Sequence, residues 1–118
     1  MYLLIAFISK TEKVHEVIQK MVELGFTGCT IFDGTGMKNA IPRSFDIPLV
    51  ASLHSIFNQE GQINKILFSV VENENEVHQL TDIIEKVLGN LDEPDTGLVI
   101  AHKLDFVKGY DRWPNTGL

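Results

Sequence analysis

Two apolar runs of strand length constrain this chain most. Residues 2–9 and 63–71 are mostly hydrophobic, which is typical of strands near the centre of a sheet. Each run precedes a segment in which apolar residues recur at helical spacing, over about 11–24 and about 73–88. Ser9 and Glu12 have the spacing of a capping box before the first helix, and Asn73 and Glu76 have it at the second.

Two further strands complete the pattern, at about 27–33 and about 98–107. The order is therefore β-α-β-β-α-β with a long loop between the second and third strands. This order predicts the α+β class and the ferredoxin-like fold, a four-stranded antiparallel sheet with both helices on one face. Residues 1–118 are expected to form a single domain around one core.

The other face of this sheet is left without helices. The first and third strands are apolar at successive positions, so both of their faces are hydrophobic. An uncovered apolar face predicts that the protein associates with further copies through the sheet.

The segment from Gly34 to about Gln62 shows no sustained alternation, and a loop of this length in a small domain is typical of a functional element. It opens at Gly34-Thr35-Gly36, where glycines would let backbone N–H groups approach an anion. Within it, residues 48–57 have the pattern of a short helix with its own apolar side. The tail at 108–118 is expected to be irregular.

The formal net charge of −6 argues against nucleic acid as a partner, because that binding requires dense Lys and Arg. No apolar run approaches the roughly 18 residues of a membrane span, and the apolar start has no signal-peptide pattern, so we expect a cytoplasmic protein. Five of the ten basic residues fall in the long loop and near the chain end, where they could hold a small anion: Lys38, Arg43, Lys103, Lys108 and Arg112.

No pattern of catalytic residues is apparent. Cys29, the one cysteine, falls within a predicted strand and is interpreted as a buried, inert thiol. The four histidines have no metal-ligand spacing, and neither a nucleophile elbow nor a Walker loop is present. The sequence therefore predicts no enzyme, no catalytic residue and no metal ligand.

Several short motifs together resemble the PII-like signalling proteins. They are Gly25-Phe26-Thr27 before the second strand, Gly34-x-Gly36 after it, the long loop, and Asp95-Thr96-Gly97 before the fourth strand. The resemblance covers nearly the whole chain in layout. It implies a homotrimer that binds a small effector in clefts between subunits, typically an adenine nucleotide. The long loop, about 34–62, corresponds to the family's T-loop, which contacts a target protein such as a transporter or an enzyme.

The resemblance also implies ligand-binding positions. Thr27 would lie near the base, and Gly34, Thr35 and Gly36 beside the phosphates. Met37 and Lys38 stand where the family places a glutamine. Asp95, Thr96 and Gly97 match the end of the family's B-loop, and Lys103 and Lys108 would lend charge to the anion. The predicted ligand-binding residues are thus Thr27, Gly34, Thr35, Gly36, Met37, Lys38, Asp95, Thr96, Gly97, Lys103 and Lys108.

Departures from the family's pattern indicate a divergent member. The B-loop is acidic, and Leu98 replaces the lysine of the classical nitrogen regulators. ATP, ADP, AMP, a cyclic dinucleotide and an adenosyl sulfonium compound all remain candidate effectors, with no permanently bound cofactor. Two alternatives stay open: a trimeric ion-tolerance protein of related fold that binds a divalent metal, and an interaction domain that docks one partner through its loop.

Overall fold

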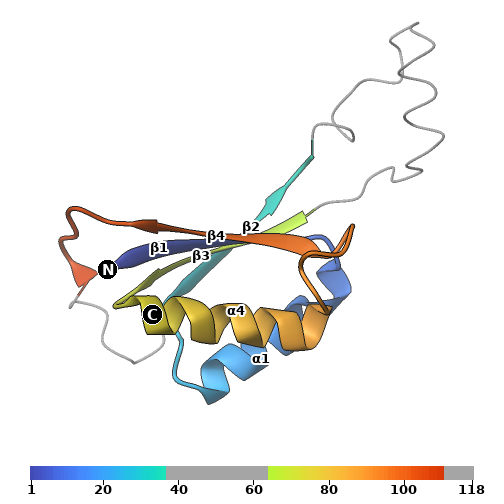
Figure 1. The fold of residues 1–118 in the computed structure, drawn as a ribbon, viewed down its shortest axis with the longest axis horizontal. Helices are drawn as coiled ribbons and strands as arrows, with labels where there is room; N and C mark the ends of the chain where they lie inside the picture. The colour runs from blue at the N-terminus through green and yellow to red at the C-terminus, as the bar shows by residue number, and fades with distance from the viewer. Residues whose placement is uncertain (37–63, 111–118) are drawn as a thin grey trace, which may run out of the picture.

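The computed structural model describes residues 1–36 and 64–110. In this part the elements are β1 (Tyr2–Ile8), η1 (Thr11–Lys13), α1 (Val14–Glu23), β2 (Cys29–Gly34), β3 (Asn64–Val71), α4 (Glu74–Leu88) and β4 (Gly97–Lys103). The strands form one antiparallel sheet in the order β2-β3-β1-β4 (Figure 1). The predicted α+β, ferredoxin-like fold is confirmed. Most of the predicted long loop, its short helix and the tail from residue 111 lie outside the described residues.

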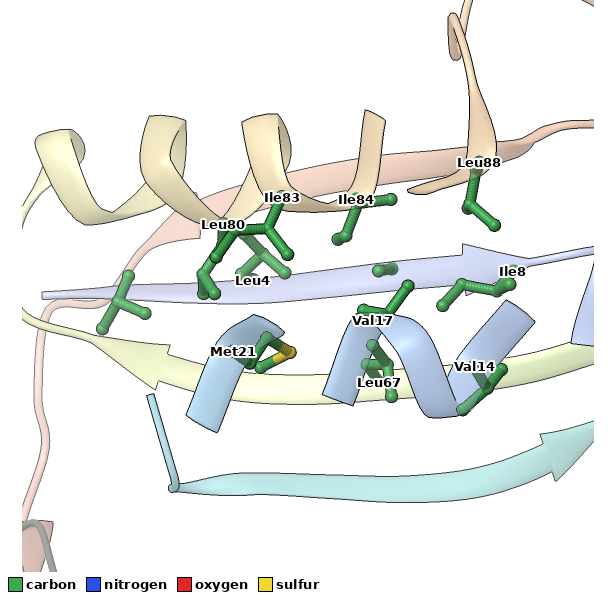
Figure 2. Close-up of a cluster of buried hydrophobic side chains, with 12 residues drawn as sticks. Leu4, Ile8, Val14, Val17, Met21, Leu67, Leu80, Ile83, Ile84 and Leu88 are labelled. Carbon is green, nitrogen blue, oxygen red and sulfur yellow. The ribbon is translucent and has the colours of Figure 1, made fainter. Parts of the chain in front are cut away.

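Both helices cover the same face of the sheet (Figure 1). The core lies between these layers, and Figure 2 shows its side chains pointing toward one another from β1, β3, α1 and α4. It consists of Leu4, Ala6, Ile8, Val14, Val17, Met21, Leu67, Val71, Leu80, Ile83, Ile84 and Leu88. Alternation along the strands decides which residues enter it, because successive side chains point to opposite faces. Leu4, Ala6 and Ile8 of β1 are therefore buried under the helices.

The opposite face, here called the open face, is also apolar. Its residues follow from the register, since directly paired residues share a face: Ile5 pairs with Phe68 of β3 and with Ile100 of β4. Phe32 of β2 packs on Phe68 with ring centroids 4.8 Å apart. The open face comprises Leu3, Ile5, Phe7, Phe32, Ile66, Phe68, Val70, Leu98 and Ile100. No described helix covers it.

The helix starts differ from one another. At α4 the predicted cap is confirmed: the backbone N–H of Glu76 donates to Asn73 Oδ1 at 2.9 Å, and Glu76 Oε2 accepts from the N–H of Glu72 at 2.7 Å. At the first helix the predicted Ser9–Glu12 capping box is wrong. The chain enters α1 through the 3-10 turn η1, and no side chain caps either element. The Ser9 carbonyl accepts from the N–H of Thr11 at 3.0 Å.

Two predicted strands have different limits in the structure. β4 ends at Lys103, although the apolar pattern predicts strand to residue 107. β4 ends there because its neighbour β1 begins opposite it. Lys103 pairs with Tyr2, the first residue of β1, and the N–H of Leu104 donates one further hydrogen bond to Met1 O. Beyond that point β4 has no strand to pair with. β2 likewise begins at Cys29, two residues later than predicted.

Candidate functional site

The register defines two ends of the sheet. At one end, which we call the glycine end, Gly34 closes β2 and Gly97 opens β4. At the other, which we call the terminal end, β1 begins at Tyr2 and β4 finishes at Lys103. The predicted ligand-binding residues of the described chain divide between these two ends.

Two groups of predicted ligand-binding residues lie at the glycine end, on opposite edges of the sheet. Gly34, Thr35 and Gly36 stand at the end of the edge strand β2, whereas residues 95–97 lead into the other edge strand, β4. β3 and β1 run between them, so the groups are separated by three interstrand spacings, about 14 Å. A single chain brings them to the same end of the sheet but not into contact.

The remaining described candidates belong to the terminal end. Thr27 precedes β2, Lys103 is the last residue of β4, and Lys108 follows it. The length of β2 alone holds this end about 17 Å from Gly34, at about 3.3 Å per residue. One chain therefore does not place Thr27 or these lysines beside the glycines. Met37 and Lys38 lie outside the described residues.

The glycines of the candidate site differ in which atoms a side chain added at each position would contact. A Cβ on Gly97 would lie 2.5 Å from Phe7 O, and φ at Gly97 is +155°. A Cβ on Gly34 would meet Ile66 Cδ1 at 2.5 Å. At Gly36 the nearest atom would be Asn64 Nδ2 at 3.9 Å, an ordinary contact. Packing thus explains glycine at position 97, while at position 36 no packing in the described chain requires it.

The turn before β4 is held by its own hydrogen bonds. The N–H of Asp92 donates to Asn90 Oδ1 at 2.9 Å, and the hydroxyl of the buried Thr96 donates to Pro94 O at 3.4 Å. Asp95 adopts a φ of 59°, a left-handed conformation that Asp tolerates better than most residues. Backbone conformation therefore accounts for Asp95 without a ligand, and its carboxylate is exposed.

Two lysines at the glycine end have partners already. Lys65 forms an ion pair with Asp33 across β3 and β2. Lys10 Nζ donates to the carbonyl of Leu88, the last residue of α4, at 3.1 Å. The exposed carboxylates of Asp92, Glu93 and Asp95 add negative charge at this end. Lys65 and Lys10 are thus already engaged, whereas Lys86 in the last turn of α4 is exposed.

Cys29 and the histidines provide no reactive centre in the described residues. Burial raises the pKa of the Cys29 thiol to about 11, so the nucleophilic thiolate is scarce at neutral pH. His78 Nε2 lies 3.8 Å from Glu74 Oε1 on the exposed side of α4. Residues 1–36 and 64–110 contain no group of three His, Cys, Asp or Glu side chains that could hold a metal ion.

An apolar groove between α1 and β2 was not predicted from the sequence. It has a volume of about 280 Å³ and is lined by Ile18, Met21 and Val22 of α1 together with Phe26, Thr27, Cys29 and Ile31. Ile18 and Val22 belong to the apolar residues that recur at helical spacing over about 11–24. Val22 is nevertheless 54% exposed, because α1 packs mainly toward α4 and the centre of the sheet and leaves the edge strand β2 partly uncovered. Among the described residues, Thr27 is the one predicted ligand-binding residue in this groove.

No protein-family model matches the chain, and no curated protein matches it. Within the described residues, no helix has both the length and the apolar character needed to cross a membrane.

Proposed function

We propose that this protein is a PII-like signal-transduction subunit. Three copies assemble through their open faces, and each cleft between two copies binds a small effector, most simply an adenine nucleotide. Binding shifts the segment at about 34–62 between conformers that differ in affinity for a target protein, a transporter or an enzyme. The protein acts as a sensor rather than as an enzyme.

The division of the candidate residues between the two ends of the sheet is the observation that carries this proposal. Gly34 and Gly36 offer backbone donors for an anion, while Thr27, Lys103 and Lys108 lie at the other end of the same chain. A site that uses both groups is complete only when the terminal end of a second copy meets the glycine end of the first.

The open face supports the assembly. Leu98, Ile100 and Phe32 are 54%, 45% and 42% exposed on it, and they adjoin half-buried side chains of β1 and β3. Exposed apolar patches of this kind mark interfaces in soluble proteins. Association of the copies removes this surface from water, which is the main favourable free-energy term in assembly.

Native mass spectrometry of the purified chain tests the proposal, alone and with an equimolar mixture of ATP, ADP, AMP, a cyclic dinucleotide and an adenosyl sulfonium compound. A trimer that retains up to three copies of one compound is the expected result. A monomer that retains none of them contradicts both the assembly and the effector. A trimer that instead retains a divalent metal, added in a parallel sample, favours the ion-tolerance alternative.

A further inference from the structure

His102 lies on the same side of the sheet as the open face. It pairs with Leu3 of β1, and it follows Leu98 and Ile100 at the alternating positions of β4. The register places the other titratable side chains of the described strands on the side that the helices cover: Tyr2, Cys29, Asp33, Lys65 and Lys103. Among the described strands, His102 is therefore the one residue on the open side whose charge can change with pH.

The surroundings of His102 do not offset a positive charge. The side chain is exposed and forms no ion pair within the described residues, and its partner across the strands, Leu3, is apolar. The charged groups around the terminal end of β1, β3 and β4 are two positive and two negative ones: the Met1 amino group, Lys103, Glu72 and Asp105. Their charges balance, so they do not favour a protonated imidazole over a neutral one.

Covering the open face makes the charge of His102 costly. An ionised group that leaves water without a partner loses far more free energy than a neutral polar group does. Separated copies therefore bind protons in preference to assembled ones. By linkage, the assembly is strongest above the range in which histidine ordinarily changes charge, about pH 5–8, and it weakens as the pH falls through that range.

The overall charge of the chain has the opposite effect. The formal net charge is −6 at pH 7 and the isoelectric point is about 5.1, so acidification from pH 7.5 to 5.5 makes each copy less negative. Weaker repulsion between copies favours association. A trimer that weakens on acidification therefore indicates a titrating group within the interface and not the overall charge.

We propose that protonation of His102 dissociates the trimer, which makes the assembly and its effector clefts sensitive to pH. The inference rests on the assembly described under the proposed function and adds a regulation to it. While His102 is neutral, the open side of the described strands carries no charge, and burial of apolar surface favours association.

Sedimentation velocity over a series of concentrations, at pH 7.5 and pH 5.5, tests the inference. The dissociation constant of the trimer should be at least about tenfold larger at pH 5.5. His102→Gln takes up no proton in this range and should remove the weakening. His102→Lys stays charged and should raise the dissociation constant at pH 7.5 as well. The matched control is His78→Gln on the exposed side of α4, which should keep the pH dependence of the unaltered chain.

The outcomes separate the possible failures. A trimer that is equally stable or more stable at pH 5.5 overturns the role of His102 and leaves the proposed assembly standing. The same conclusion follows if the weakening persists in His102→Gln, or if His102→Lys assembles normally at pH 7.5. Far-UV circular dichroism at each pH shows whether the fold is retained, and a signal lost together with the trimer also overturns the inference. A monomer at both pH values overturns the inference and the proposed assembly together.

Discussion

Gly97 begins β4 so close to β1 that a methyl group on its α-carbon would stand 2.5 Å from the carbonyl oxygen of Phe7. This oxygen belongs to the backbone of a central strand, which cannot move aside without disturbing the sheet. The φ of +155° at Gly97 adds a second reason for glycine. Among the glycines that match the PII-like pattern, the fold itself therefore demands Gly97, and Gly25 adopts a φ of +87° that also favours glycine.

The first prediction concerns stability at two of the matched glycines, Gly97 and Gly36. Gly97→Ala should lower the free energy of unfolding by about 1–3 kcal/mol, because it combines backbone strain with a steric overlap. Gly36→Ala should change it by less than about 0.5 kcal/mol, since no atom of the described residues crowds that position. Urea denaturation followed by circular dichroism measures both. Equal losses for the two variants would show that Gly36 has a structural role as well.

The second prediction separates binding from folding. Gly36→Val should weaken effector binding at least about tenfold, equivalent to about 1.4 kcal/mol, because a side chain there would obstruct a ligand's approach to the backbone. Its fold should be unchanged. Gly28→Val is the matched control, because a Cβ at position 28 meets nothing within 4 Å and one at position 36 meets only Asn64 Nδ2 at 3.9 Å. Calorimetric titration with the compound selected by native mass spectrometry gives the affinities. Unaltered affinity in Gly36→Val would remove Gly36 from the site.

The third prediction addresses the open face. Ile100→Asp places a charge on the β4 edge of that face and should convert the proposed trimer to monomers, because burying an unpaired carboxylate is costly. Gln79→Asp introduces the same residue on the exposed side of α4 and should leave the trimer intact. Sedimentation velocity distinguishes the two outcomes. Trimers that persist in Ile100→Asp would assign the assembly to another surface.

The fourth prediction tests the cap of α4. Asn73→Ala removes the acceptor of the N–H of Glu76 and should lower the free energy of unfolding by about 1 kcal/mol. Asn75→Ala, within the same first turn and exposed, should have a much smaller effect. Thermal and urea denaturation measure this difference. Comparable losses at both positions would mean that the cap contributes little.

The fifth prediction follows from the Cys29 thiol, whose pKa burial raises from 9.0 to about 11. Below about pH 9 the thiol keeps its proton in both the folded and the unfolded chain. Between about pH 9 and 11 the unfolded chain loses this proton while the folded chain retains it, so the free energy of unfolding falls as pH rises. Cys29→Ser should lack this part of the decline. Denaturation curves across this pH range test the difference, and identical profiles would contradict it.

Sequence periodicity predicted the fold because the strongest patterns are local. The apolar runs that became β1 and β3 are hydrophobic on both faces, and the Asn73 cap uses residues only three apart in the chain. Strand limits were less predictable. The apolar residues after Lys103 favour strand, but β4 ends there because β1, its partner in a distant part of the chain, begins opposite it.

The candidate site illustrates the same distinction. The sequence identified glycines suited to an anion and lysines suited to its charge, but spacing along the chain does not reveal which end of the sheet each residue reaches. The pairing of Asp33 with Lys65, which engages a positive charge beside Gly34, also required the register of β2 on β3. Helical periodicity could not predict the groove beside Val22, because the spacing of apolar residues does not distinguish a covered apolar face from an uncovered one.

By itself, the sequence determined the order of strands and helices, the ferredoxin-like class and the apolar character of both faces of the sheet, because these depend on side-chain alternation over a few residues. Only the tertiary structure decided that the candidate residues fall at opposite ends and opposite edges of the sheet. The physical reason is that strand pairing joins segments distant in sequence, and the register of that pairing sets which residues become neighbours.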